Sequence, residues 1–218
     1  YARRMLVIND ETWMRLTNDD YQGDVVFGVP VDVVYPNVPY ILKRATTLYP
    51  RIRLSLVSSL TKLLRQRLKD GDIDLILTTE DRLNKGGETL QQVENHWYGA
   101  ANGKAHLSRP LPLTICNHCS QKQNVIRTLD EANVPWKLIG DTDSEITVDA
   151  IVSADLAVTP KIHIPENCAT LPAGILPPLD DVLINMYQAP HRDSALIEKI
   201  AEIVRDAFQR DLRIAAAS

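Results

Sequence analysis

The sequence predicts an α/β protein with two lobes, because one alternation of short strands and amphipathic helices occurs twice along the chain. The first series runs from Val25 to Leu77 and the second from Leu113 to Val158. Each series contains three strand patterns separated by two helix patterns. Such alternation indicates βαβαβ units with right-handed crossovers and mainly parallel sheets. Ligands of such sheets bind beyond the carboxyl ends of the strands, so we expect a ligand site there.

The first series is defined by the spacing of its apolar residues. Its predicted elements are a strand at 25–29, a helix at 38–48, a strand at 51–57, a helix at 60–68 and a strand at 73–77. Tyr49-Pro50 ends the first helix, because a residue before proline disfavours helical geometry. Ser58 and Ser59 offer a cap for the second helix, and Gly71 offers its C-terminal stop.

The second series has the same order of elements and is followed by a closing strand and helix. Its predicted elements are a strand at 113–115, a helix at 121–132, a strand at 136–139, a helix capped by Ser144 and a strand at 155–158. Beyond Pro177-Pro178, residues 182–186 form a predicted returning strand and 194–208 an amphipathic helix. At the other end, apolar residues at three- and four-residue steps over 1–18 predict a helix that packs against another helix.

The composition is that of an ordinary soluble protein that needs no disulfides. Its 218 residues include 24 Lys and Arg against 28 Asp and Glu, a net charge of -4. Because phosphate binding needs a concentrated basic face, this balance argues against a nucleic-acid surface. Three cysteines do not make a secreted disulfide framework and suit a reducing cytoplasm. No signal peptide or membrane span is evident, so we expect a cytoplasmic location without membrane contact.

The sequence lacks the common catalytic motifs. It contains no phosphate-binding glycine loop ending in Lys-Ser or Lys-Thr, no Gly-x-Ser-x-Gly elbow and no His-Glu-x-x-His. An enzyme on a two-lobed scaffold needs a concentrated set of basic or acid–base residues in its cleft, and none is evident. We therefore expect no enzyme activity and no cofactor.

Several segments match one known family in their order and spacing. They are YARRMLVINDE, GDVVFGVP, LYPRIRLSL followed by Ser58-Ser59-Leu60, and LLRQRLKDGDIDLIL. The most specific pieces are the strand exit Gly28-x-Pro30, the Tyr-Pro before an alternating strand, and the helix end at 70–75. Together they resemble the regulatory half of LysR-type transcriptional regulators. The segments HWYGAA at 96–101 and VPWKL at 134–138 are similar to a subgroup that includes regulators of motility and virulence.

The resemblance covers nearly the whole chain and implies a fold like that of type 2 periplasmic binding proteins, two lobes joined by crossing strands. It implies the end of a linker helix at 1–20, lobe I at 21–83 and 161–218, and lobe II at 84–160. In the family, the linker helix follows an N-terminal winged helix-turn-helix domain that binds DNA. This sequence shows no such domain before Tyr1, so we expect DNA as a partner only through the absent domain. It also implies a homodimer or homotetramer, paired through the helix at 38–48 and the helix after Cys119. The family usually carries a glycine pair where this sequence has Ser153-Ala154-Asp155, which puts the local geometry in doubt.

Four strand exits and Thr159 are expected to converge on the cleft between the lobes. The predicted effector-binding residues are Val31, Asp32, Ser58, Ser59, Thr79, Asn117, His118 and Thr159. Backbone N–H groups at Ser58 and Ser59 would attract a carboxylate, although such serines taken singly most often cap a helix. Asp32 and Glu80 would oppose a simple anion unless a cation offsets them. Lys161 is a candidate for that role, although an exposed lysine is far commoner.

The segment Cys116-Asn117-His118-Cys119 has the cysteine spacing of zinc and redox sites. A structural zinc site needs four ligands, and Cys168 and His163 lie far along the chain, so we expect no metal. Oxidation at Cys116 or Cys119 would make a thiol switch, with Cys119 at a helix start the more reactive thiol. The favoured interpretation is a tight loop that lines the ligand pocket.

The resulting functional hypothesis is an effector-sensing and oligomerisation domain. A small cytoplasmic metabolite binds between the lobes, stabilises one arrangement and thereby changes DNA binding by the absent domain. One alternative is a thiol-based redox sensor of the same family. Another is a solute-binding protein, which should carry a secretion signal and lack the helix at 1–16.

Overall fold

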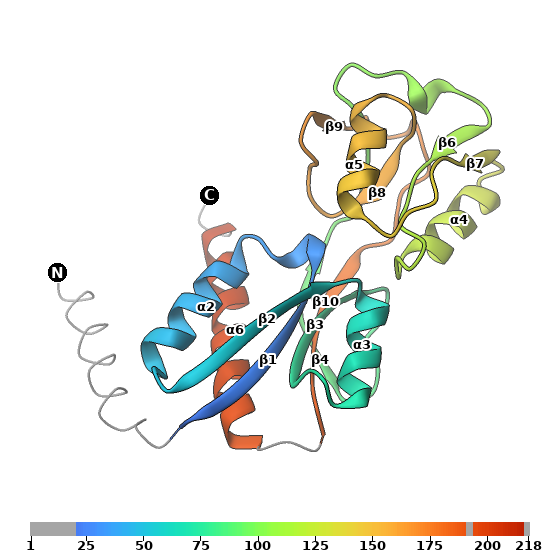
Figure 1. Ribbon diagram of the computed structural model, residues 1–218. Coiled ribbons are helices and arrows are strands. Elements are labelled where there is room, and N and C mark those ends of the chain that lie inside the picture. Colours follow the sequence, from blue (N-terminus) through green and yellow to red (C-terminus); the bar gives the residue numbers. More distant parts are fainter. Residues whose placement is uncertain (1–20, 191–193, 216–218) are drawn as a thin grey trace.

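The computed structural model describes residues 21–190 and 194–215, which form two lobes (Figure 1). The helix predicted over 1–18 lies outside the described residues. We call lobe I the part built around a five-stranded sheet, and lobe II the part built around a three-stranded and a two-stranded sheet. The chain passes from lobe I to lobe II after residue 93 and returns before residue 182.

The sheet of lobe I has the strand order β2-β1-β3-β10-β4. Its strands are β1 (Gly23–Pro30), β2 (Ile52–Ser59), β3 (Leu75–Glu80), β4 (Gly87–Val93) and β10 (Val182–Gln188). Strand β1 pairs in parallel with β2 and β3, whereas β10 lies antiparallel between β3 and β4. The two crossover connections contain α2 (Asn37–Leu48) and α3 (Thr61–Asp70), so the strand–helix alternation predicted from the sequence is confirmed in lobe I.

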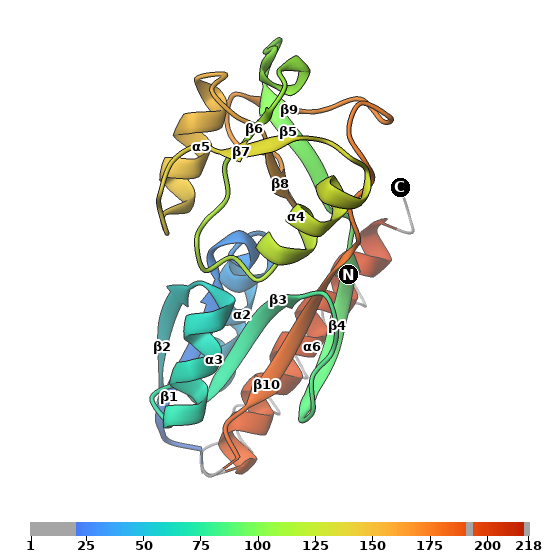
Figure 2. The same ribbon diagram turned by 90° about the vertical axis from the view of Figure 1, so that its right-hand side faces the viewer.

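Helices cover both faces of this sheet (Figure 2). Helix α2 and the closing helix α6 (Ser194–Ala215) pack on one face, where Val25, Phe27 and Val29 are buried. Leu64 of α3 packs on the other face against Ile76. The alternating side chains of β1 therefore serve two cores. The apolar stripe of α2, which we expected to pair with a second subunit, is buried in the lobe's own core.

Gly28 of the Gly28-x-Pro30 exit lets α3 approach the sheet closely. A Cβ atom at Gly28 would lie 2.9 Å from Cγ2 of Ile76 and 3.0 Å from Cδ2 of Leu64. Both atoms belong to fully buried side chains, so neither can move without disturbing the core. Packing, and not an unusual backbone angle, therefore explains this glycine.

Lobe II surrounds a second core and combines parallel and antiparallel pairing. Its strands are β5 (His96–Ala100), β6 (Leu111–Leu113), β7 (Trp136–Leu138), β8 (Thr159–Lys161) and β9 (Cys168–Thr170), and its helices are α4 (Lys122–Glu131) and α5 (Glu145–Ser153). Strand β6 is parallel to β7, and Leu113 also bridges Val158 in parallel. Strand β5 runs antiparallel between β8 and β9. Short 3-10 turns at Val31–Val33 (η1) and Ala105–Leu107 (η2) complete the two lobes.

Three local features differ from the sequence prediction. Strands β4 and β9 were not predicted. Strand β4 follows the boundary expected at residue 84 but pairs in the sheet of lobe I, and β9 follows the boundary expected at residue 161 but pairs in lobe II. Ser58 and Ser59 belong to β2, and α3 begins at Thr61 without a side-chain cap. Of the strand predicted at 155–158, Val158 alone pairs, as an isolated parallel bridge to Leu113, and β8 at 159–161 pairs antiparallel with β5.

Asp155 interrupts the strand predicted at 155–158. It adopts a left-handed backbone conformation with φ 57°, which glycine favours and aspartate tolerates better than most residues. Its carboxylate accepts hydrogen bonds from the backbone N–H groups of Lys104 and Ala105 at the start of η2, at 2.8 to 3.0 Å. Asp155 thus makes a turn and fixes a neighbouring loop, and it lies away from the space between the lobes.

Candidate functional site

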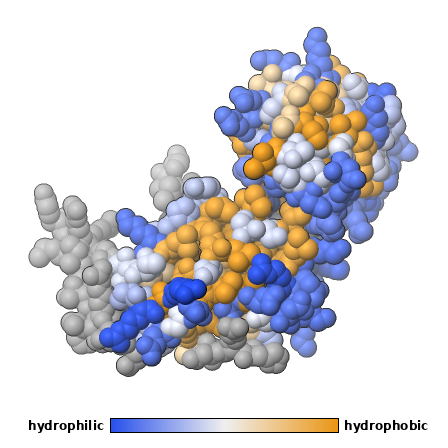
Figure 3. Space-filling view, viewed as in Figure 1, coloured by the Kyte–Doolittle hydropathy of each residue, from blue (hydrophilic) through white to orange (hydrophobic). Residues whose placement is uncertain are grey.

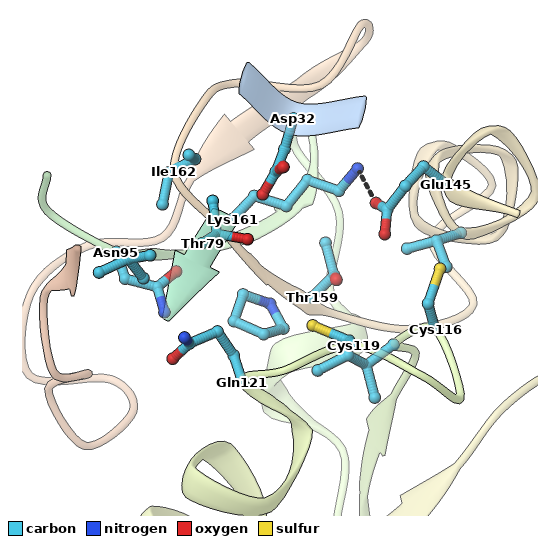
Figure 4. A pocket seen from close by; sticks show the side chains of 14 residues that line it. Asp32, Thr79, Asn95, Cys116, Cys119, Gln121, Glu145, Thr159, Lys161 and Ile162 are labelled. Atoms are coloured by element: carbon cyan, nitrogen blue, oxygen red, sulfur yellow. Dashed lines mark ion pairs between the residues drawn. The ribbon is translucent and has the colours of Figure 1, made fainter. Parts of the chain in front are cut away.

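A small cavity lies between the lobes, and both lobes line it (Figure 4). Its volume is about 40 Å³, which leaves room for a few water molecules. The polar lining residues are Asp32, Thr79, Asn95, Cys116, Cys119, Gln121, Glu145, Thr159 and Lys161. A neighbouring cavity of about 30 Å³ shares Asp32, Thr79, Cys119 and Glu145 with it. The two spaces therefore form adjoining parts of one cleft.

Lys161 is the positively charged side chain of this lining. The side chain is 7% exposed, and its Nζ lies 2.8 Å from Oε2 of Glu145 and within ion-pair distance of Asp149. Burial alone would lower the pKa of Lys161, but the charge of Glu145 and hydrogen bonds to both carboxylates raise it above its usual value. Conversely, burial would raise the pKa of Glu145, but the lysine and the Cys116 thiol lower it. The lysine charge is therefore engaged by two carboxylates of α5.

Asp32 faces this ion pair from lobe I (Figure 4). It is held in η1, directly after β1 ends at Pro30. Burial, together with the negative charge of Glu145, raises the pKa of Asp32 to about 6. Within the described part of the chain, no other side chain forms an ion pair or hydrogen bond with its carboxylate. Asp32 is thus a poorly compensated acid in the cleft.

Gln121 supplies a buried polar group from lobe II. It stands at the N-terminus of α4, is 8% exposed, and its Nε2 has no hydrogen-bond partner among the described residues. An unsatisfied buried amide costs about 1–3 kcal/mol. Gln121 and Asn95 lie across the cavity from Glu145 (Figure 4). A ligand with an acceptor oxygen would satisfy this donor.

The structure brings five of the predicted effector-binding residues to the cleft. Asp32 and Thr79 line both spaces, Thr159 lines the larger one, and Val31 and Ser59 line the smaller one. Thr159 and Thr79 are buried, and the Thr79 hydroxyl lies 3.1 Å from that of Thr61. Val31 and Asp32 follow β1, Ser59 ends β2 and Thr79 is the next-to-last residue of β3. Thr159 begins β8, directly after the parallel bridge of Val158 to Leu113.

The other three predicted residues lie elsewhere. Ser58 is exposed on β2 and lines neither space. Asn117 and His118 are exposed on the loop before α4 and line a third space, a groove of about 500 Å³ that both lobes line and that shares Thr61, Cys119 and Ser120 with the smaller cavity. Asp141 and Asp143 hold them there, since Asn117 Nδ2 donates to Asp141 at 2.6 Å and His118 Nδ1 lies 2.8 Å from Asp143.

The cysteine loop lines the cavity, as the favoured interpretation predicted. Cys116 is buried and Cys119 is half-buried, and the three cysteines of the chain are unpaired. Burial raises the pKa of Cys116 far above that of an ordinary thiol and raises the pKa of Cys119 to about 12. The expected low-pKa thiol is therefore not what this environment produces. Among the residues that the structure describes, no three His, Cys, Asp or Glu side chains group so as to hold a metal ion.

Glu80, which we expected near the ligand, is instead the centre of a buried hydrogen-bond network in lobe I. Its side chain is 8% exposed and its carboxylate accepts from five side chains at 2.7 to 3.0 Å: Arg65, Thr78, Asn84, Asn185 and Tyr187. The Arg65 guanidinium also lies 4.5 Å from the centroid of the Tyr187 ring. The network ties α3, β3 and β10 together where the chain leaves lobe I.

Two hydrogen bonds cross directly between the lobes near α4. Ser120 Oγ donates to the backbone oxygen of Thr79 at 2.6 Å, and Asn124 Nδ2 donates to Asp81 at 3.0 Å. Ser120 is one residue from Gln121, so the same segment lines the cavity and contacts the opposite lobe. A ligand that moves this segment would change the lobe arrangement.

Comparison with known proteins identifies the family. A family model described as the LysR substrate binding domain matches residues 18–159, more than half of the chain. The chain belongs to this family. The LysR domain is 25% identical over 216 residues to the HTH-type transcriptional regulator PecT of Dickeya dadantii (strain 3937), covering 97% of this chain and 68% of that protein. The sequence-based prediction of a LysR-type regulatory domain is confirmed.

Solved structures show the same fold. The effector binding domain of QuiR in complex with shikimate has a TM-score of 0.69 at 16% identity, covering 87% of this chain and 99% of that chain. The reduced form of the regulatory domain of OxyR2 from Vibrio vulnificus has a TM-score of 0.64 at 13% identity, covering 85% and 96%. Full-length BenM has a TM-score of 0.65 at 15% identity, covering 97% and 76%. The two-lobed, type 2 periplasmic-binding-protein-like α/β fold is therefore confirmed for this LysR domain.

Proposed function

We propose that the cleft lined by Asp32, Gln121 and Lys161 is the effector site of this regulatory domain. A small cytoplasmic metabolite binds there and changes DNA binding by a winged helix-turn-helix domain. The observation that carries the proposal is the buried, unpartnered Nε2 of Gln121 in a cavity that both lobes line. Buried amides in folded proteins nearly always have partners, so this donor points to a bound molecule.

The lobe arrangement provides the means of response. Binding shifts an equilibrium between arrangements only by the difference in affinity between them. In the present arrangement, Ser120 and Asn124 bond to lobe I beside the cavity. An effector that contacts Gln121 and Asp32 together would favour or oppose these bonds, and the linker helix would transmit the change to DNA. The domain itself acts by binding and not by catalysis.

Effector contacts fall to the residues that line the cleft. We assign them to Asp32, Thr79 and Thr159, joined by Val31 and Ser59 at the smaller space. Ser58, Asn117 and His118 line neither of these two cavities, so we assign them no effector contact in this arrangement. No helix in the described ranges, 21–190 and 194–215, is long and apolar enough to cross a membrane.

A homodimer or homotetramer is the proposed assembly. The hypothesis gains support from the open edge of the sheet at β2, since unpaired strand edges attract partners. Figure 3 shows apolar surface on lobe I. Two leucines of this lobe are exposed, Leu56 on β2 at 39% and Leu63 on α3 at 45%. Neither leucine lies in the buried stripe of α2.

The test is thermal unfolding of the 218-residue chain against a library of cytoplasmic metabolites. Binding to the folded state stabilises it by about 2.7 kcal/mol at a hundredfold excess of ligand over Kd. We expect a metabolite-specific rise in the unfolding temperature that Thr159→Ser retains and Gln121→Leu weakens. The control is Gln92→Leu, because Gln92 is exposed on β4. The absence of any metabolite response, together with a peroxide response lost in Cys119→Ser, would replace this proposal by the thiol switch.

A further inference from the structure

The cleft is more negative than a site for a simple anion should be. Three carboxylates, those of Asp32, Glu145 and Asp149, lie around one ammonium group, that of Lys161. Lys161 is already paired with two of them. An anionic ligand would have to break these buried ion pairs and would then meet Asp32. Separating a buried pair is strongly unfavourable, because it leaves an uncompensated charge.

The polar groups of the lining divide into two kinds. Asp32 and Glu145 on one side are acceptors that can pair with a positive charge. Gln121 on the opposite side presents a donor that is nine-tenths buried and has no acceptor among the described residues (Figure 4). A metal ion does not fit this arrangement, because the described residues offer no set of three metal-ligating side chains.

We infer that the effector of this cleft is a small organic cation that also carries an acceptor oxygen. Its ammonium group pairs with Asp32 and Glu145, and its hydroxyl or carbonyl oxygen accepts a hydrogen bond from Gln121. The inference rests on the proposed function, since it assigns the charge class of the ligand at that same site. The cavity volume of about 40 Å³ restricts the ligand to few heavy atoms in the present lobe arrangement.

The titration of Asp32 gives the inference a characteristic pH dependence. The groups that face Asp32 are Glu145 of α5, Lys161 of β8 and the Cys119 thiol. With a pKa of about 6, Asp32 is mostly protonated at pH 5 and mostly ionised at pH 7.5. A cation needs the ionised form, so its affinity should rise about tenfold between these two pH values. An anion would show the opposite trend.

The experiment uses three matched probes on the 218-residue chain: 3-aminopropan-1-ol as the cation, propane-1,3-diol as the neutral form and 3-hydroxypropanoate as the anion. Thermal unfolding is followed at constant ionic strength at pH 5 and pH 7.5. We expect only the cation to raise the unfolding temperature, and to do so more at pH 7.5. Asp32→Asn should abolish the response. Asp24→Asn, at the exposed opposite end of β1, should keep it.

The outcomes separate this inference from the proposed function. Stabilisation by 3-hydroxypropanoate and not by the amine overturns the charge assignment, but leaves the cleft as an effector site. No response to the amine in the millimolar range also overturns it, whereas the metabolite library still decides whether the cleft binds an effector. Asp32→Asn is expected to fold, because it removes a poorly compensated buried charge. An amine response that survives in Asp32→Asn would place the cation elsewhere.

Discussion

Replacing Glu80 by leucine should destabilise lobe I strongly. The change leaves three buried or nearly buried donors without their acceptor, those of Thr78, Asn185 and Tyr187. Each unsatisfied buried group costs about 1–3 kcal/mol. The Arg65 side chain is 37% exposed, so water compensates for much of its lost ion pair, which contributes little to the loss of stability. Burial of the leucine side chain offsets part of the loss, and we expect a net loss of about 3–5 kcal/mol.

Urea unfolding followed by circular dichroism measures this loss. With a slope of about 3 kcal/mol per molar urea, the midpoint should fall by about 1–1.7 M. Glu80→Gln should lose less, because the amide keeps the shape and one acceptor oxygen. The matched control is Glu131→Leu, since Glu131 is 72% exposed and pairs weakly with Arg127 at 3.8 Å. Equal midpoints for Glu80→Leu and this control would refute the view that the Glu80 network stabilises the lobe.

Three further predictions test local features. Gly28→Ala should cost about 1–3 kcal/mol by overpacking, visible as a lower urea midpoint; an unchanged midpoint would mean that α3 moves freely. Asp155→Ala should lower the free energy of unfolding by about 1 kcal/mol, because it removes the hydrogen bonds to two backbone N–H groups. These bonds lower the Asp155 pKa, so their contribution is present at neutral pH and is lost as the pH falls below the usual value of 3.8. A difference in unfolding free energy between variant and parent that does not change with pH would contradict this. Cys116 and Cys119 should react with iodoacetamide far more slowly at pH 8 in the folded chain than in urea, as followed by mass spectrometry, because burial raises both pKa values; equal rates would favour a thiol switch.

The predicted residues that lie at the cleft are those whose positions follow from strand topology. Asp32, Thr79 and Thr159 stand at or next to the ends of buried strands, and such ends meet wherever parallel strands belong to one α/β fold. Short apolar runs gave the strand positions. No tertiary information was needed to bring these three residues toward one region.

Other cleft residues were missed because their roles depend on tertiary contacts. Glu145 begins α5 beside the cap Ser144, and Gln121 stands at the N-terminus of α4, so helix starts were the available signal. Lys161 was named as a candidate cation and not assigned to the site, because a lysine is usually exposed; its pairing with two carboxylates of α5 explains its burial. His118 was placed in the cleft from its loop, but a hydrogen bond to Asp143 turns it outward.

The fold prediction failed where the sequence pattern was weak. Strand β4, with the sequence GETLQQV, is mostly half-buried and polar at the sheet edge, so it lacks a clear alternation. Asp155 interrupts the strand predicted at 155–158, and periodicity cannot reveal a left-handed residue beside an apolar run. The first series was predicted more accurately, since its strands belong to a sheet that helices cover on both faces, which gives them clear apolar patterns.

The position of β10 between β3 and β4 in the lobe I sheet has a consequence for the order of folding. Synthesis of the chain reaches all of lobe II before residues 182–188 emerge, yet β3 and β4 contact each other only through β10. Lobe II is therefore able to fold on the ribosome while β3 still has an open edge. Such nonlocal pairing slows folding, and an open edge promotes aggregation. We expect nascent chains that end before β10 to depend on chaperones, and chains that extend past α6 to be released from them.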